Sequence, residues 1–276
     1  GDRAACVGDL VEVLFSTFGN PSTVSWINDN PAIGLPASGT GDISFIAANV
    51  TGVETATITV GAQAKGGYAY ITNSNGVTSV IDLATNTVVA NIPTNSGQYG
   101  VSVSPDGSKV YVTREEIGVT APGELIVIDA ASNTVVTTLQ MGNGPHGVAV
   151  TPDGQRVYVS NRTAGNVFVV DASTNTVLSV IPTGVGSSPT GIVASPDGNS
   201  VYVGCQEMAL RIDVASNTIL NTFPINVGGG LRGLTITPDG NTLYACCDLS
   251  FSNTDKVLGI DVNTGMITAD IVTGDA

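Results

Sequence analysis

Apolar and polar residues alternate along this chain in short stretches, and clusters of Gly, Pro, Asn and Asp separate them. From about residue 67 to the C-terminus, these stretches form a unit that recurs five times. The clearest landmark of the unit is a Pro-Asp-Gly triplet. The triplets begin at Pro105, Pro152, Pro196 and Pro238, at intervals of 47, 44 and 42 residues. Alternation with a period of two predicts β-strands, and Pro-Asp-Gly predicts the tight turns between them.

A strand with a central tyrosine follows each triplet, and a further copy lies upstream of the first triplet. The five copies are Ala69–Thr72, Val110–Thr113, Val157–Ser160, Val201–Gly204 and Leu243–Cys246. Each unit then has an apolar strand that ends in Asp and is followed by Asn-Thr. Several short strands per period of about 42 residues are the signature of a β-propeller. The second to fifth units contain four strands each, whereas the first lacks an obvious inner strand.

The first 61 residues do not share the repeat. They contain alternating strands at Leu10–Phe15, Val24–Ile27, Ile43–Ile46 and Thr55–Val60, separated by turn clusters, which predict a small β-sandwich around Trp26. We therefore expect an all-β protein with two domains. Residues 1–61 form an immunoglobulin-like β-sandwich, and residues 62–276 form a β-propeller of about five four-stranded blades.

Two resemblances accompany this pattern. Trp26–Gly41 and Thr55–Val60 resemble the PKD-like, immunoglobulin-like modules of bacterial surface and secreted adhesins. Those modules usually carry a further strand before the Cys-x-Gly that corresponds to Cys6–Gly8, so this module is expected to lack its first strand. The repeats, through Tyr111–Thr113 and Tyr158–Asn161, resemble the YVTN family of β-propellers. This family often has seven blades, and the resemblance implies an extracellular or cell-surface location.

One segment has two predicted places. Counting back from Tyr70 places Ile58–Ala62 where the inner strand of the first blade should lie, yet Thr55–Val60 also closes the sandwich. The closing strand could run on into the blade, the first blade could have three strands, or another subunit could supply a strand by β-augmentation. The assembly edge that we predict comprises Thr55, Thr57, Ile58 and Val60.

Composition narrows the range of partners. The formal net charge is −14, and only 12% of residues are charged. Such a chain repels the phosphates of nucleic acids and anionic lipid heads, so we expect neither as a partner. The apolar runs have strand length, so insertion into a membrane is not expected either.

Four cysteines, Cys6, Cys205, Cys246 and Cys247, fit no zinc spacing. Since side chains alternate across a strand and neighbouring blades pack opposite faces together, Cys205 and Cys246 could face each other. We predict a disulfide between them, with free buried thiols as the alternative. Cys6 and Cys247 would remain for a bond between domains or subunits. This use of cysteine favours an oxidising exterior.

A candidate ligand site comes from the residue before the Gly that opens each inner strand: Tyr99, His146, Thr190 and Arg232. Equivalent positions of a propeller form a ring at one mouth of the central channel. His beside Arg and Tyr could bind a small anion there, and a solvated channel mouth is the alternative. Because His146 is the only histidine, no multi-histidine metal or haem site is expected within one chain.

Other candidate motifs have simpler explanations. Stretches such as Asp171–Thr176 superficially look like calcium loops but lack the bidentate Glu, so we interpret them as turns in which Asp bonds to its own backbone. The insertion Arg114–Glu124 lengthens the second unit and predicts an exposed loop, with contact to a partner as the alternative. A Gly-x-Ser-x-Gly elbow and a phosphate-binding Gly loop are missing. We expect no catalytic residue, metal or cofactor.

These observations favour a non-enzymatic structural protein. We expect a subunit of a surface layer, adhesive fibre or filament, which self-associates as a homopolymer, possible partners being other surface proteins or glycans. The alternative is a monomeric surface module that binds a glycan, peptide or small anion at the channel mouth. A propeller enzyme is the third hypothesis.

Overall fold

The computed structural model describes residues 10–13, 23–36, 38–40, 43–46, 58–63, 67–115, 122–184, 186–225, 228–248 and 255–274. Apart from one short 3₁₀ helix, the elements of these residues are β-strands. Internal contacts divide the chain into two compact units. One comprises residues 1–68 with 82–85, and the other comprises residues 69–81 with 86–276.

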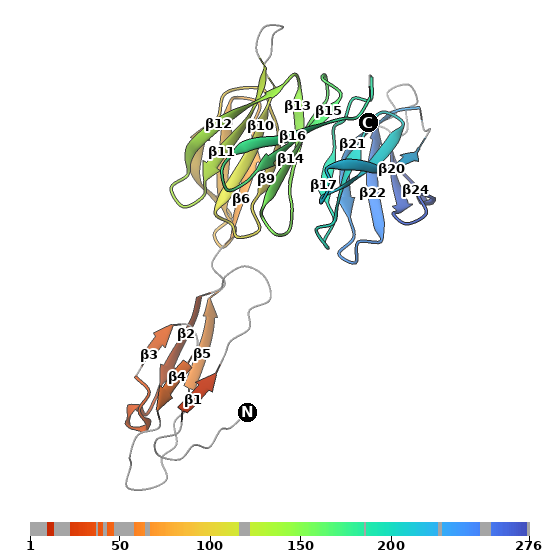
Figure 1. Cartoon of the computed structure of the whole chain (residues 1–276). Helices are drawn as coiled ribbons and strands as arrows, with labels where there is room; N and C mark the ends of the chain where they lie inside the picture. Colours follow the sequence, from red (N-terminus) through yellow and green to blue (C-terminus); the bar gives the residue numbers. More distant parts are fainter. Residues whose placement is uncertain are drawn as a thin grey trace. The chain divides into compact units, whose positions relative to one another are not determined.

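The first unit contains two small antiparallel sheets (Figure 1). One pairs β1 with β4, and the other has the order β3-β2-β5. The elements are β1 (Leu10–Val13), β2 (Thr23–Asn28), η1 (Pro31–Ile33), β3 (Ser38–Thr40), β4 (Ile43–Ile46) and β5 (Ile58–Gln63). Buried Asn28 donates through Nδ2 to the carbonyl of Leu35 at 2.8 Å, which fixes the turn around η1. The immunoglobulin-like character of this unit and the boundary at residue 61 stay predictions.

The segment with two predicted places forms strand β5. It pairs with β2 along its length, with Val60 opposite Trp26 and Ile58 opposite Asn28. It therefore belongs to the first unit, at the edge of its sheet, and the first blade keeps three strands. Of the predicted assembly edge, Ile58 and Val60 lie on this edge strand. Thr55 and Thr57, like Cys6, lie outside the described residues.

The second unit is a row of five antiparallel sheets, which we call blades 1 to 5 in chain order (Figure 1). Blade 1 has three strands and each of the other four blades has four, so the four-strand prediction for the second to fifth units is confirmed. Blade 1 contains β6 (Tyr68–Thr72), β7 (Val77–Asp82) and β8 (Thr87–Pro93), and blade 2 contains β9 (Gln98–Val103), β10 (Lys109–Arg114), β11 (Gly123–Asp129) and β12 (Thr134–Gly142). Blade 3 contains β13 (Pro145–Val150), β14 (Arg156–Asn161), β15 (Asn166–Asp171) and β16 (Thr176–Pro182), and blade 4 contains β17 (Ile192–Ala194), β18 (Ser200–Gly204), β19 (Met208–Asp213) and β20 (Thr218–Pro224). Blade 5 contains β21 (Gly230–Ile236), β22 (Thr242–Asp248), β23 (Asp255–Asp261) and β24 (Ile267–Gly274).

The core lies between consecutive blades. The face of a blade that carries the central tyrosine packs against the opposite face of the next blade, which is rich in valine; we call them the tyrosine face and the valine face. Tyr111 of blade 2, for example, shares a cluster with Val157 and Val159 of blade 3, and all three are fully buried. Similar clusters join blades 1 and 2, 3 and 4, and 4 and 5. Burial of each such side chain contributes about 1.5–3 kcal/mol.

The turns have the predicted chemistry. The glycines of the four triplets have φ between 71° and 73°, a left-handed conformation that glycine adopts without strain. In the first triplet, Asp106 Oδ1 accepts hydrogen bonds from Ser104 Oγ at 2.5 Å and from Ser108 N at 3.0 Å. In the Asp-x-x-x-Asn turns, Asp171 Oδ1 likewise accepts from Ser173 N and Thr174 N, both at 2.8 Å. These local bonds support the turn interpretation of the calcium-like stretches.

The predicted disulfide between Cys205 and Cys246 is wrong, because both thiols are free. Cys205 is buried in the cluster that blade 4 shares with blade 3. Cys247 packs in the cluster between blades 4 and 5, so its neighbour Cys246 points to the other side of blade 5 and is exposed. The two cysteines of the expected pair thus point away from the junction between their blades. A further finding is that no helix in the described part of the chain has the length and apolar character to cross a membrane.

Candidate ligand-binding site

The inner strands of blades 2 to 5 begin around one cavity of about 270 Å³. Each blade contributes the first residues of its inner strand, so the four predicted residues Tyr99, His146, Thr190 and Arg232 all line it. The glycines after Tyr99, His146 and Thr190 let neighbouring inner strands approach closely. A Cβ atom on Gly147, for instance, would lie 2.3 Å from the carbonyl oxygen of Thr190. The repeat therefore places four variable side chains on a nearly constant backbone.

Hydroxyl groups fix this backbone. Ser160 Oγ, at the end of β14, donates to the carbonyl of Thr190 in the next blade at 2.6 Å, while the N–H of Gly147 in its own blade donates to it at 2.9 Å. Thr113 bridges blades 2 and 3 in the same way, with 2.6 Å to the carbonyl of His146. Thr190 itself is buried, and its hydroxyl donates to the carbonyl of Leu231. Its side chain thus holds the rim together.

His146 stacks on an aromatic ring and is affected by the charges of two arginines. Its ring stacks on that of Tyr99, with 4.6 Å between ring centroids and an interplanar angle of 26°. Burial lowers the pKa of His146, and the positive charges of Arg162 and Arg232 lower it further. His146 is therefore neutral at pH 7, and a negative charge placed beside it would favour its protonated form.

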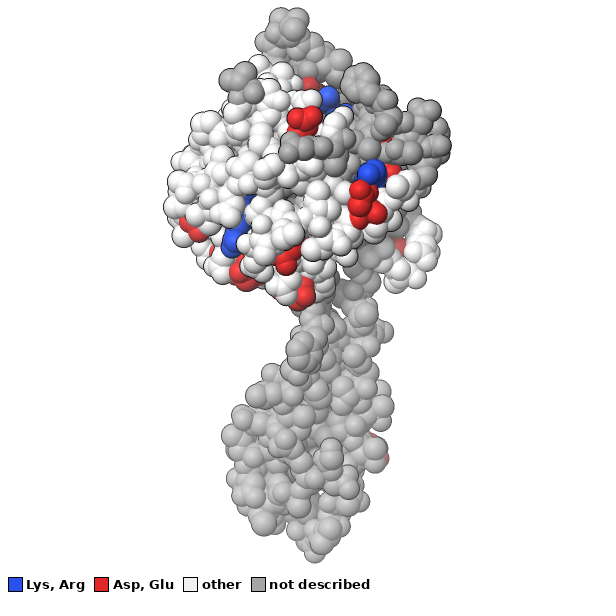
Figure 2. All heavy atoms as spheres, turned by 90° about the vertical axis from the view of Figure 1, so that its right-hand side faces the viewer, with Lys and Arg blue, Asp and Glu red and all other residues white. Residues whose placement is uncertain are grey.

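The sequence analysis missed Arg162. It directly follows β14, and its positive charge acts on His146. The sequence signal for Arg162 is its position directly after Asn161, at the end of the strand that contains Tyr158. Arg232 lines the cavity, and the positive charges of Arg162 and Arg232 both act on His146. On the face drawn in Figure 2, by contrast, charged side chains lie in small separate patches on a largely uncharged surface.

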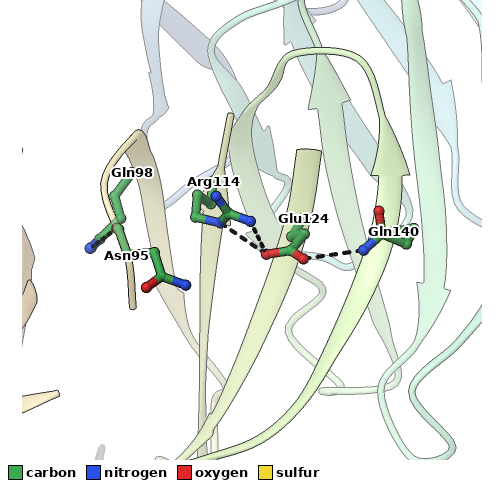
Figure 3. A network of polar contacts seen from close by, with 5 residues as sticks. All are labelled: Asn95, Gln98, Arg114, Glu124 and Gln140. Atoms are coloured by element: carbon green, nitrogen blue, oxygen red, sulfur yellow. Dashed lines mark hydrogen bonds and ion pairs between the residues drawn. The ribbon is translucent and has the colours of Figure 1, made fainter. Parts of the chain in front are cut away.

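A polar network holds the base of the insertion in blade 2 (Figure 3). Arg114 donates to Glu124 Oε2 from Nε at 2.9 Å and from Nη2 at 2.5 Å, and Gln140 Nε2 donates to Glu124 Oε1 at 3.1 Å. In the register of the sheet, Arg114 lies opposite Gln98, the first residue of inner strand β9. The insertion thus leaves the sheet on the side of the mouth, and its residues 116–121 lie outside the described residues.

Comparison with known proteins identifies the class of fold. A sequence model of YNCE-like β-propellers matches residues 34–156, and a model described as lactonase, 7-bladed β-propeller, matches residues 119–215. Together with the blades and their common cavity, these matches show that the chain contains a β-propeller. A search of curated proteins gave no significant match.

Two solved structures share the fold. One is Kuenenia stuttgartiensis hydrazine synthase, with 29% identity over 64% of this chain and 49% of that chain, at a TM-score of 0.59. The other is the dihydro-haem d1 dehydrogenase NirN in complex with DHE, with 20% identity over 75% of this chain and 43% of that chain, also at 0.59. The present chain thus spans less than half the length of either.

These matches correct one expectation. The prediction that the protein is not an enzyme is wrong, because the matched structures are a synthase and a dehydrogenase and the second sequence model is a lactonase. The chain lacks a recognisable nucleophile and base, but this absence does not exclude an enzyme. A propeller can instead contribute binding residues to chemistry performed elsewhere.

Proposed function

We propose that the mouth of this propeller binds a small anionic ligand, such as a carboxylate, as a substrate or cofactor group of an enzymatic system. The observation that carries the proposal is the convergence of Arg232, His146 and Tyr99 on one cavity, with Arg162 acting on the same histidine. Guanidinium groups are the preferred partners of carboxylates and phosphates. The stacked rings of Tyr99 and His146 offer a flat apolar wall beside them.

The surrounding charge makes this site selective. The net charge of −14 disfavours anions near the chain in general, whereas the positive charges of Arg162 and Arg232, which both act on His146, favour an anion at the mouth. The cavity of about 270 Å³ suits a small ligand or one charged group of a larger one. The enzymes with a similar fold, one of them solved in complex with DHE, support a role in ligand handling.

Calorimetric titration with sulfate or oxalate tests the proposal, and neutral dimethyl sulfone is the size-matched control for sulfate. Loss of a charged hydrogen bond costs about 1.5–3 kcal/mol, so Arg232→Ala should weaken binding about tenfold or more. Arg232→Lys keeps the charge and should lose less. Arg211→Lys, in the middle of β19, is a control outside the cavity and should bind as the wild type does. Equal binding of dimethyl sulfone, or full affinity of Arg232→Ala, would refute the anion site.

A specific observation favours a second candidate function, self-association through the two ends of the blade row. Ile71, on the valine face of blade 1, is 46% exposed, whereas its counterparts Val112 and Val159 are fully buried. Ile271, on the tyrosine face of blade 5, is 48% exposed, whereas its counterpart Ile181 is 5% exposed. The row therefore ends in one unfilled face of each kind.

A second copy of the chain supplies both missing partners. Its blade 1 would present a valine face to the tyrosine face of blade 5, which repeats the contact made at all four internal junctions. Head-to-tail contacts of this type extend into filaments unless the rotation closes a ring. The three-stranded blade 1 and the edge strand β5 offer further edges for such assembly.

Sedimentation velocity over a range of concentrations tests self-association. Ile71→Asp should shift the distribution toward monomer, whereas Val136→Asp, at an exposed position of outer strand β12, should leave it unchanged. A wild-type protein that sediments as a monomer at all concentrations up to about 100 μM would argue against assembly by these faces. Anion binding would be unaffected by that result.

A further inference from the structure

A second cavity, of about 530 Å³, lies between blades 2 and 3 at the ends of the inner strands opposite the mouth. The Pro-Asp-Gly turns of both blades and the Asp-Ala-Ser turn of blade 3 line it. The acidic lining residues are Asp106, Asp153 and Asp171, and the single basic one is Lys109. The formal charge of the lining is therefore negative.

The carboxylates of Asp106, Asp153 and Asp171 are ionised at neutral pH, and two of them keep an oxygen atom without a recorded hydrogen bond. Local hydrogen bonds lower the pKa of Asp106 and of Asp171 to about 2, and the pKa of Asp153 is lowered by Thr151 in the same way. The recorded bonds of Asp153 and Asp171 all go to Oδ1, which leaves the Oδ2 atoms of both able to accept from a ligand. Lys109 is already engaged, because Nζ donates to the carbonyl of Ala172 and, at 3.5 Å, to Asn175.

An independent observation points to a ligand. Tyr111 also lines this cavity and is fully buried, yet its hydroxyl oxygen has no hydrogen-bond partner among the residues that the structure describes. A buried hydroxyl without a partner is costly and rare, so such a group in a cavity wall marks a place where a ligand can bind. Burial raises the pKa of this hydroxyl to about 12, and the negative charges of Asp106 and Asp171 act in the same direction.

At the junction between blades 3 and 4, a side chain of the protein itself occupies the equivalent position. Between blades 3 and 4, Arg156 stands where Lys109 stands between blades 2 and 3. Its Nη1 donates to the carbonyl of Val214, and the hydroxyl of the equivalent tyrosine, Tyr158, donates to Asn217 Oδ1 at 2.7 Å. A guanidinium group thus occupies that junction, and the tyrosine hydroxyl there has a hydrogen-bond partner. The shorter Lys109 leaves the corresponding space open.

We propose that the cavity between blades 2 and 3 binds an organic cation, a guanidinium or primary ammonium group on a short alkyl chain. The ligand would donate to the free carboxylate oxygens of Asp153 and Asp171 and to the hydroxyl oxygen of Tyr111. An Arg or Lys side chain of a partner protein and a free diamine have this chemistry in common. A metal ion fits less well, because the described residues include no group of three acidic or other ligand side chains with suitable spacing.

Titration followed by NMR or calorimetry tests the site with butylguanidinium and its neutral isostere butylurea. Butylguanidinium should bind with saturation and butylurea should not. Tyr111→Phe and Asp153→Asn should each weaken binding at least severalfold, and Lys109→Arg should abolish it by filling the cavity. The matched variants Tyr158→Phe and Asp197→Asn, at other junctions, should bind as the wild type does.

Two further arms decide the source of the cation and control for folding. Putrescine and an acetylated, amidated Gly-Arg-Gly peptide distinguish a free diamine from a protein side chain by which one binds more tightly. Circular dichroism melts must show that each variant folds, and Tyr111→Phe is the decisive one because it deletes only the unpartnered oxygen. Equal binding of butylurea, or unchanged affinity of Tyr111→Phe, would overturn the proposal.

Discussion

The hydroxyl of Tyr158 donates a 2.7 Å hydrogen bond to Asn217 Oδ1, a residue of the next blade. Asn217 is held in a left-handed conformation, with φ of 54°, by the turn that follows β19. The equivalent turn residue Asn175 has the same φ of 54°, yet the recorded bond to its Oδ1 comes from Lys109 and Tyr111 has no partner. The same backbone thus supports two different junctions.

This contrast predicts opposite effects of one substitution. Tyr158→Phe removes a buried hydrogen bond and should lower the free energy of unfolding by about 1 kcal/mol. Tyr111→Phe removes a hydroxyl that the protein leaves unsatisfied, so it should leave stability unchanged or raise it by up to about 1 kcal/mol. Thermal melts of the two variants and the wild type, without added ligand, provide the comparison. A fall of similar size in both would mean that Tyr111 has an equivalent partner in solution.

Anion binding at the mouth should depend on pH through His146. Burial and two arginines lower its pKa in the free protein, and a bound anion would raise it again. Binding then takes up a proton, so affinity for sulfate should rise as pH falls below the ordinary histidine value of about 6.5. Titrations at several pH values measure it. His146→Gln should remove most of this dependence, and a flat wild-type profile would show that His146 is not coupled to the anion.

The acidic turns should make the fold sensitive to acid. Hydrogen bonds lower the pKa of Asp106 and of Asp171 to about 2 in the folded protein, below the value of 3.8 for an unperturbed Asp. The unfolded chain therefore binds protons first, and the contribution of these groups is present above pH 3.8 and is lost as pH falls toward 2. The melting temperature should fall between about pH 5 and 2. Asp106→Asn should be less stable at pH 7 and lose less on acidification, and an acid response equal to that of the wild type would count against this origin.

The hydroxyl bridges between inner strands should contribute measurably to stability, because Ser160 and Thr113 are fully buried. Ser160→Ala leaves the carbonyl of Thr190 and the N–H of Gly147 without their recorded partner, which costs about 1–3 kcal/mol. Thr113 makes the same pair of contacts in blade 2, so Ser160→Thr is a conservative control that should retain most of the stability. Urea unfolding measures both variants. If Ser160→Ala unfolds at the wild-type midpoint, the bridge does not contribute to stability.

Local sequence pattern was enough to predict most strands and turns, the second to fifth blades and the grouping of four residues at the mouth. These features follow from local rules: alternation with a period of two, glycine at positive φ, and equivalent positions of a repeat that fall at equivalent places in space. Tyr99, His146, Thr190 and Arg232 could therefore be grouped from spacing alone, although they are up to 133 residues apart in the chain.

The three-dimensional structure was needed wherever two pairings of a segment compete or two blades meet. Strand β5 could pair with β2 or with β6, and hydrogen bonding along its whole length to β2 decided between them. Parity allowed Cys205 and Cys246 to face each other, but each points away from the shared junction. The charge of Arg162 at the mouth and the missing partner of Tyr111 depend on contacts between distant side chains. Local pattern cannot specify such contacts, because they depend on how whole blades pack.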